Sequence, residues 1–458
     1  MKNIGTLVSG KMSFTALFNP KMRALSKINN YNLKYFLPTN KDNLEIHKFD
    51  IERAKQVLNN SSFHQFLRVI RRFSVKNEST RIKYLDFISE DIFRRDELRS
   101  LAGYFSILLL SNFPKIDALC RLIERTAFDD NIFSVGQINN DINLALVSSV
   151  GNFGFEVETI FARECLNNKI PVVSIVSNYD NFLNRGAAGF LPTKLCVWSK
   201  YMADNAVKCG IPANSIEIIG APSFDELFTK PIIGKVEYLS KLGLDPNKKT
   251  ILYAGGVLIG QTFQILQSLI DSKLVGECNL IYRPYPHSKV NSLKLDSLIN
   301  NYLSENNNIY VVDNKSLSET IDSEFSRFDL ANFDFLDEKI EQLRHSDLVI
   351  NHFSTIGLEA CALNKPVVQI GFNGDVMFSI KKALHPSVNI NQVHNVAQRN
   401  FSASKVAFSD IELLRYANEY LDNPELNSDN RLSYAKFECG YLDGLATNRL
   451  FSVINSLT

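Results

Sequence analysis

Short runs of apolar, mostly branched residues recur along the chain. They alternate with longer segments whose apolar residues return at helical spacing. A continuous apolar run of about four to eight residues, bounded by turn residues, predicts a strand that is buried on both faces. Such runs occupy residues 4–10 with their turn, the region of Phe36, and residues 143–150, 170–176, 194–199, 216–220, 250–254, 279–282, 309–312, 347–350 and 367–370. Strands that alternate with helices predict an α/β fold built on parallel sheets.

A break in this pattern divides the chain into two halves. Residues 229–249 hold two prolines and several lysines, after which the strand–helix pattern starts again. We therefore expect a first domain at residues 1–230, a second at 231–430 and a closing helical segment at 431–458. Residues 50–122 have a mainly helical pattern, and the polar segment 316–338 indicates an insertion.

Residues 347–371 are the clearest strand–helix–strand unit in the sequence. The helix should end at Pro366, because proline disfavours helical backbone in the residue before it. At its other end, free backbone N–H groups and the positive end of the helix dipole together bind anions. His352, Ser354 and Thr355 lie at this corner. The unit therefore predicts an anion-binding turn.

Glu359 lies one helical turn beyond that corner and leaves two interpretations open. One is that Ser354 or Thr355 only caps the helix. A capping box, however, places the acid three residues after the cap, whereas Glu359 is four after Thr355 and five after Ser354. The other is that the Glu359 carboxylate accepts hydrogen bonds from two neighbouring hydroxyls of a ligand, such as those of a ribose.

Polar residues also follow other predicted strands, at the sheet edge where α/β proteins bind ligands. Gly255 and Gly256 follow the strand at 250–254 and allow a backbone to approach a diphosphate closely. Arg283 and His287 lie in a proline-containing loop after the strand at 279–282 and suit contacts to phosphate. For His287 an ordinary surface-loop position is equally open.

The first half of the chain offers its own polar positions. Asp180 lies in the polar stretch 177–186, directly after the strand at 170–176, and Glu156 lies on the helix at 155–166. For Asp180 a structural hydrogen bond within its own turn is an alternative to a functional role. The turn at residues 9–11 is a further ligand-binding candidate, with an ordinary strand-to-helix loop as the alternative.

Three of these stretches resemble one known family. They are H-x-S-T-x-G-x-E-A from His352, S-x-Y-D-N with a later R-G from Ser177, and G-x-P-x-F-D from Gly220. Together they resemble the GT-B fold glycosyltransferases of bacterial surface polysaccharide biosynthesis, which are related to CDP-glycerol glycerophosphotransferase-like enzymes. In the second stretch tyrosine replaces the family's tryptophan and arginine replaces its lysine. The resemblance implies two Rossmann-like domains facing across a cleft, and a C-terminal helix that returns to the first domain.

The resemblance also implies a function. Ser354 and Thr355 would hold the donor phosphates and Glu359 the nucleotide ribose. The enzyme would move a sugar from a nucleotide-sugar donor to a glycan or lipid-linked glycan acceptor of the capsule, O-antigen or lipopolysaccharide type, with no further cofactor and no metal. If the enzyme inverts configuration, an acid of the first domain would act as base. Asp180 is the first candidate for that base and Glu156 the second.

Three alternatives remain open. A polyol-phosphate transferase of the CDP-glycerol type would share the fold and motifs. A UDP-sugar 2-epimerase would share the fold, but its serine- and glycine-rich turn and its set of carboxylates are not found in this sequence. The third alternative is a non-catalytic GT-B protein that binds a glycan or a partner.

Composition and charge narrow the protein class. The 45% hydrophobic and 22% charged content is ordinary for a soluble protein, and a formal net charge of +1 gives no field that would recruit nucleic acid. The seven scattered cysteines predict buried free thiols in a reducing compartment. The sequence shows no signal peptide or membrane span, so we expect a cytoplasmic protein.

One predicted helix leaves open a contact between this expected cytoplasmic protein and the membrane surface. Residues 63–73 form an amphipathic helix with Arg68, Arg71 and Arg72 outside its apolar face. Such a helix either packs on the protein's own core or makes a peripheral contact with the anionic inner membrane.

Overall fold

The computed structural model describes residues 2–8, 16–17, 20–37, 46–48, 62–92, 97–127, 142–228, 233–256, 259–285, 303, 308–312, 334–373 and 389–458. The chain divides into two compact units: unit 1 is Met1–Asp225 with Phe437–Thr458, and unit 2 is Glu226–Lys436. The candidate turn at residues 9–11, His287 and most of the predicted insertion at 316–338 lie outside the described residues.

Unit 1 is built on a seven-stranded sheet with the order β3-β2-β1-β4-β5-β6-β7. The strands are β1 (Lys2–Leu7), β2 (Tyr31–Leu37), β3 (Ile46–Lys48), β4 (Leu144–Val147), β5 (Val172–Ile175), β6 (Lys194–Val197) and β7 (Ile216–Ile218). Every described pairing is parallel. The direction of strand order reverses between β1 and β4, so this sheet has its switch point there.

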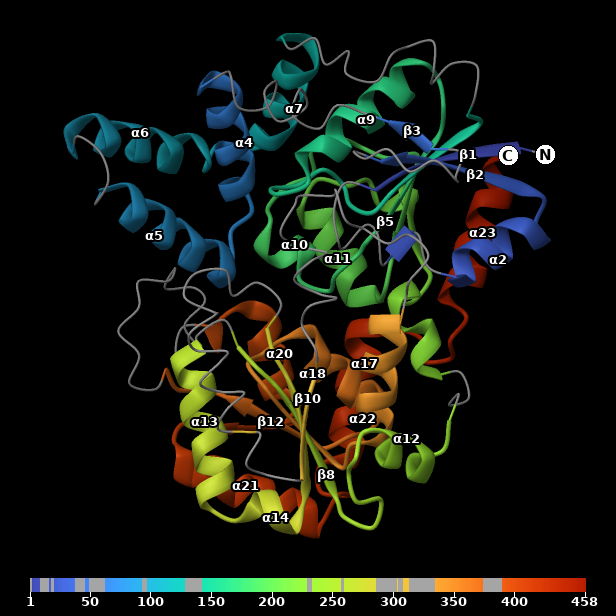
Figure 1. Cartoon of the computed structure of the whole chain (residues 1–458). Helices are drawn as coiled ribbons and strands as arrows, with labels where there is room; N and C mark the ends of the chain where they lie inside the picture. The colour runs from blue at the N-terminus through green and yellow to red at the C-terminus, as the bar shows by residue number, and fades with distance from the viewer. Residues whose placement is uncertain are drawn as a thin grey trace. The chain divides into compact units, whose positions relative to one another are not determined.

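Helices cover both faces of the unit 1 sheet. The helices that pack on it are α2 (Pro20–Ile28), α9 (Glu156–Asn167), α11 (Lys200–Lys208) and α23 (Ala446–Leu457), and the short α10 (Asn181–Asn184) contacts α11. Alternate residues of β4 serve the two faces: Leu144 and Leu146 pack in one core cluster, Ala145 and Val147 in the other. Leu450, Phe451 and Ile454 of α23 belong to the first of these clusters, so the C-terminal helix covers that face beside α2 (Figure 1).

Asp225 fixes the start of α23. Its two carboxylate oxygens accept hydrogen bonds from the backbone N–H groups of Ala446 and Thr447, each at 2.8 Å. Lys21 of α2 forms an ion pair with the same carboxylate at 2.9 Å. Asp225 is the last residue of the G-x-P-x-F-D motif, and in this structure it caps the N-terminus of the C-terminal helix.

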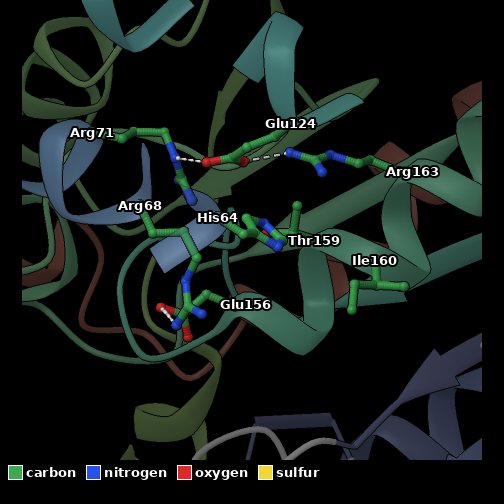
Figure 2. Close-up of a pocket in the computed structure, with 8 residues that line it drawn as sticks. All are labelled: His64, Arg68, Arg71, Glu124, Glu156, Thr159, Ile160 and Arg163. Atoms are coloured by element: carbon green, nitrogen blue, oxygen red, sulfur yellow. Dashed lines mark hydrogen bonds and ion pairs between the residues drawn. The ribbon is translucent and has the colours of Figure 1, made fainter. Parts of the chain in front are cut away.

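A helical subregion follows β3 and consists of α4 (Ser62–Ser74), α5 (Glu78–Ile92), α6 (Glu97–Leu110) and α7 (Ile116–Ala127). A buried ion cluster joins it to α9. Glu124 of α7 lies between two arginines, with 3.4 Å from one oxygen to Nε of Arg71 and 2.6 Å from the other to Nη2 of Arg163 (Figure 2). Burial raises the pKa of Glu124, but the two arginines outweigh burial and hold that pKa below its usual value.

The arginines of this cluster also hold backbone carbonyls. Arg71 donates to the carbonyls of Gly151 and Ala187, at 3.2 and 3.0 Å, and Arg163 donates to that of Gly189 at 3.1 Å. The cluster therefore ties α4 to the turn after β4 and to the segment that precedes β6.

Unit 2 is built on a six-stranded sheet with the order β10-β9-β8-β11-β12-β13, again parallel in every described pairing. The strands are β8 (Thr250–Ala254), β9 (Asn279–Arg283), β10 (Ile309–Val311), β11 (Leu348–Asn351), β12 (Val367–Ile370) and β13 (Lys405–Ala407). The described helices of unit 2 are α12 (Lys235–Lys241), α13 (Ile259–Asp271), α14 (Leu274–Glu277), α17 (Asp334–His345), α18 (Thr355–Ala362), α20 (Val393–Asn400) and α21 (Asp410–Asp422). The helix α22 (Ser428–Cys439) begins in unit 2, and its last three residues belong to unit 1. Strand order reverses between β8 and β11.

The structure confirms the predicted strands and adds two that the sequence pattern did not reveal. These are the short edge strands β3 (IHK) and β13 (KVA), in which polar residues interrupt the apolar run that the pattern requires. All seven cysteines are buried free thiols, as predicted.

We expect Asp225→Ala to lower the free energy of unfolding by about 2–4 kcal/mol, because two charge-assisted hydrogen bonds at the start of α23 are lost. Urea unfolding measures this. Asp443→Ala is the control, since Asp443 pairs with Arg449 at the surface and should cost less than about 1 kcal/mol. Equal losses in the two variants would contradict the capping role.

Removing the acid of the buried cluster should cost more. Glu124→Gln leaves Arg71 and Arg163 facing each other without a countercharge, and we expect a loss of about 3–5 kcal/mol. The control is Glu78→Gln, which breaks the exposed pair with Arg81 on the neighbouring helix. A Glu124→Gln variant as stable as the control would show that the cluster does not hold this subregion in place.

Candidate functional site

The switch point of unit 2 brings together two of the turns that the sequence predicted to bind a ligand, the turn after β8 and the turn after β11. Parallel strands end at one edge of a sheet, and ligands bind there where the strand order reverses. Gly255 and Gly256 follow β8, and His352 follows β11, which is the neighbour of β8 across the switch point. Gly256 is in close contact with His352, because a Cβ on Gly256 would lie 2.7 Å from the His352 ring.

His352 is held as a neutral ring. Its Nε2 lies 3.0 Å from the Tyr253 hydroxyl of β8, and burial lowers the pKa of His352 to about 3. A neutral imidazole can donate or accept one hydrogen bond at each nitrogen but adds no positive charge. His352 therefore suits a polar contact with a ligand and not a charge–charge contact with phosphate.

The turn between β11 and α18 is fixed by side-chain amides. Phe353 has a positive φ of 50°, which a non-glycine residue adopts at an energetic cost. Its N–H donates to Oε1 of Gln369 at 2.7 Å, and the N–H of Ser354 donates to Oδ1 of Asn351 at 3.1 Å. Ser354 is the N-cap of α18 and is exposed, and its side chain makes no capping hydrogen bond. For Ser354 the capping interpretation is therefore not supported.

Glu359 is buried on the second turn of α18 and has a partner that the sequence did not suggest. Lys339 of α17 donates to Oε1 of Glu359 at 2.6 Å. Arg283, at the end of β9, donates to Oε1 of Gln342 at 3.0 Å. Burial lowers the pKa of Arg283, and the nearby charges of Glu338 and Glu359 partly offset that effect. Charged groups of both signs therefore lie close together here: Lys339 pairs with Glu359, and Arg283 lies near Glu338 and Glu359.

Unit 1 places Asp180 in the loop after β5, as the residue before α10. One carboxylate oxygen accepts a hydrogen bond from Nδ2 of Asn184 at 2.8 Å, which is the local structural role left open by the sequence. The other oxygen, Oδ1, is buried and has no hydrogen-bond partner among the described residues. One carboxylate oxygen of Asp180 therefore holds its own turn together, and the other is available to accept a further hydrogen bond.

Glu156, the second candidate base, is paired. Its carboxylate lies 2.7 Å from Nη2 of Arg68, and both side chains are largely buried (Figure 2). This pair joins the start of α9 to α4. A catalytic role for Glu156 stays a prediction, and the ion pair gives it a structural role.

The three arginines of α4 all make contacts within unit 1. Arg71 is buried in the ion cluster, Arg68 pairs with Glu156, and the Arg72 guanidinium lies 3.9 Å from the centre of the Phe153 ring. The helix therefore packs on the protein's own core, which was one of its two sequence interpretations. In the described part of the chain, no helix has the length and apolar character to cross a bilayer.

Sequence comparison with known proteins gives a match over part of the chain. No protein-family model matches the chain. A processive diacylglycerol beta-glucosyltransferase from Staphylococcus epidermidis is 30% identical over 93 residues, which are 20% of this chain and 23% of that relative. The match therefore spans less than a quarter of the relative's length.

Solved structures match over the whole chain. The UDP-GlcNAc 2-epimerase of Methanocaldococcus jannaschii is 12% identical with a TM-score of 0.52, over 100% of both chains. S. aureus MnaA, in a co-structure with UDP, is 15% identical with a TM-score of 0.52, over 99% of this chain and 96% of that one. At these identities the likeness is one of fold. It confirms the predicted α/β fold with two Rossmann-like domains of the GT-B type.

Proposed function

We propose that this chain is an enzyme that acts on a nucleotide-sugar and that unit 2 binds the nucleotide diphosphate. The observation that carries this proposal is the corner at the switch point, where Gly256, the neutral His352 and the amide-fixed turn at Ser354 lie together. The start of α18 supplies N–H groups and a positive dipole end for the diphosphate. Two matched structures carry UDP or act on a UDP-sugar by their descriptions, which supports the same ligand class.

Within that class we propose glycosyl transfer to a surface-glycan acceptor. The sequence match to a glucosyltransferase and the motif resemblance at His352 to Glu359 support this reaction. Helix N–H groups would stabilise the charge that develops on the leaving diphosphate. Asp180, which has one buried oxygen without a hydrogen-bond partner among the described residues, would take the acceptor's proton. A polyol-phosphate donor would use the same groups, and a contact with the inner membrane would follow from a lipid-linked acceptor.

A 2-epimerase is the second candidate, because UDP-GlcNAc 2-epimerases are among the solved structures that match over the whole chain. The two reactions differ in their products. A transferase releases a nucleoside diphosphate, whereas a 2-epimerase returns a nucleotide-sugar with inverted carbon 2 and releases none.

A binding panel followed by product analysis tests the proposal. UDP-, CDP-, GDP-, TDP- and CMP-linked donors are screened by thermal shift, and UDP-N-acetylglucosamine is incubated with the protein and analysed by NMR. Stabilisation by one nucleotide class supports a nucleotide-sugar enzyme. Inversion at carbon 2 without release of UDP would replace glycosyl transfer by epimerisation. A protein that binds no nucleotide would be the non-catalytic alternative.

Glu359→Gln should weaken nucleotide binding about tenfold to hundredfold, because a neutral amide accepts weaker hydrogen bonds from ribose hydroxyls than a carboxylate does. Calorimetric titration with the nucleotide found in the panel measures this. Glu341→Gln is the control, since Glu341 lies on the same helix as Lys339 and accepts hydrogen bonds from Arg344 and His345. Both variants should lose stability. Unchanged affinity in Glu359→Gln would rule out the ribose role.

Gly256→Ala should disturb the corner directly, because the added methyl would overlap the His352 ring. We expect a loss of about 1–3 kcal/mol in stability together with weaker nucleotide binding. Gly234→Ala is the matched control, since a Cβ there meets no atom within 4 Å and should change stability by less than about 0.5 kcal/mol. Normal nucleotide affinity in a folded Gly256→Ala variant would place the nucleotide elsewhere.

A further inference from the structure

The helical subregion of unit 1 contains two helices that are apolar on opposite faces. Ile107 of α6 and Cys120 of α7 are buried in one core cluster with residues of α4, and both helices pack against α4 (Figure 1). Leu110, Ile116 and Ile123 are partly buried against the same cluster. A helix that only covers its own core has a polar outer face. The outer faces of α6 and α7 are instead apolar.

Large apolar side chains are exposed on these outer faces. They recur at helical spacing and continue through the turn that joins the helices, and each is 43–62% exposed: Phe105, Leu108, Leu109, Phe113, Leu119 and Leu122. The turn is tight, since the N–H of Phe113 donates to the carbonyl of Leu110 at 3.0 Å and that of Ile116 donates to the carbonyl of Phe113 at 3.3 Å. Exposed apolar residues that lie together mark interaction sites, whereas single ones are ordinary.

The exposed charge around these side chains is positive. The sequence from Leu98 to Ala127 has four cationic residues and two acids: Arg99, Lys115, Arg121 and Arg125, with Asp117 and Glu124. Asp117 pairs with Arg121 at 2.8 Å, and Glu124 belongs to the buried ion cluster. Lys115 and Arg125 are exposed at helical spacing from Leu119 and Leu122, and no acid in the described part of the chain pairs with either. We call the six apolar residues together with Lys115 and Arg125 the α6–α7 surface.

The polar side chains in the turn are already hydrogen-bonded within the protein. Nδ2 of Asn112 donates to the carbonyl of Leu108 at 2.6 Å, and Nζ of Lys76 donates to Oγ of Ser111 at 2.8 Å. A protein partner normally forms about one hydrogen bond per 100–200 Å² of interface, whereas lipid acyl chains need none. A second copy related by a two-fold axis would bring the same cations together, which like charge disfavours. An apolar centre beside unpaired cations therefore fits an anionic lipid surface.

We propose that the α6–α7 surface binds peripherally to an anionic lipid bilayer. Its apolar side chains enter the boundary between headgroups and acyl chains, to a depth of about 5–10 Å, and Lys115 and Arg125 contact lipid phosphates. With 14 and 12 residues, α6 and α7 are shorter than the roughly 20 residues that a spanning helix needs.

This contact differs from the one that the sequence left open through α4, whose Arg68 and Arg71 form ion pairs inside unit 1. The contact would bring the unit that carries Asp180 to a lipid-linked acceptor. Only this last consequence rests on the proposed function, because binding to a bilayer needs neither donor nor reaction.

Sedimentation with vesicles tests the surface directly. Wild-type protein should bind vesicles of phosphatidylcholine with phosphatidylglycerol, and should bind pure phosphatidylcholine less well. Leu119→Gln combined with Leu122→Gln should weaken binding at least about tenfold, because two apolar side chains no longer enter the lipid. Lys115→Gln and Arg125→Gln should each cost about fivefold on the anionic vesicles only. These positions are exposed, so the melting temperature should stay near that of wild type.

The control for the apolar change is Ile411→Gln on α21 of unit 2, since Ile411 is 81% exposed but lies outside the α6–α7 surface. It should bind vesicles as wild type does. A wild type that leaves both kinds of vesicle unbound would overturn the proposal. So would a double leucine variant that binds as well as the control.

Fluorescence locates the part of the chain that enters the lipid. The single tryptophan of the chain, Trp198, is buried and gives a constant background. In Phe113→Trp the added emission should shift to shorter wavelength on anionic vesicles and be quenched by brominated acyl chains. Phe408→Trp, at an exposed position in unit 2, should show neither effect. An unshifted Phe113→Trp signal with bound vesicles would place the contact on another surface.

Analytical ultracentrifugation without lipid separates the bilayer from a second copy of the chain. A wild type whose oligomeric state is unchanged by Leu119→Gln with Leu122→Gln supports the bilayer. A dimer that these changes dissociate would show that a second copy covers the surface and would overturn the proposal. No nucleotide enters these experiments. A protein that binds vesicles but no nucleotide-sugar would therefore overturn the proposed function and leave the α6–α7 surface standing.

Discussion

Parallel strand pairing is the constraint on which the described structure depends. In both sheets every described pairing is parallel, so within each unit all carboxyl ends meet at one edge. Residues far apart in sequence are therefore brought together without any dedicated interaction. Gly256 and His352 meet because β8 and β11 are neighbours across a reversal of strand order. In unit 1 the same rule brings the turn after β4 next to the loop after β5, where Asp180 lies.

Buried acids in this protein are compensated in different ways. Glu124 has two arginines, Glu359 has Lys339, and Asp225 has Lys21 together with two backbone N–H groups. These pairings offset the large cost of removing a charge from water. Burial, with a smaller contribution from the charge of Asp180, raises the pKa of the buried Glu438 to about 8.

The sequence was most informative where a signal is local. Continuous apolar runs predicted the long strands, and the polar turn after β11 was recognised from its spacing. The partners of site residues in unit 2 were not predictable, because Lys339 and Gln369 reach the site through tertiary packing. Periodicity likewise showed that the arginines of α4 lie outside its apolar face. Periodicity could not show that Glu124 of α7 and Glu156 of α9 pair with these arginines, because that requires knowing which helices are neighbours.

The division of the chain also bears on the order in which it folds. Unit 2 is continuous in sequence, whereas unit 1 needs residues 437–458 to cover one face of its sheet. During synthesis the chain emerges from its N-terminus, and domains fold as units once their residues are available. The nested unit can therefore finish first, while the sheet synthesised earliest waits with exposed apolar side chains at Leu144 and Leu146. The part of the chain that is made first is therefore the last to complete its core.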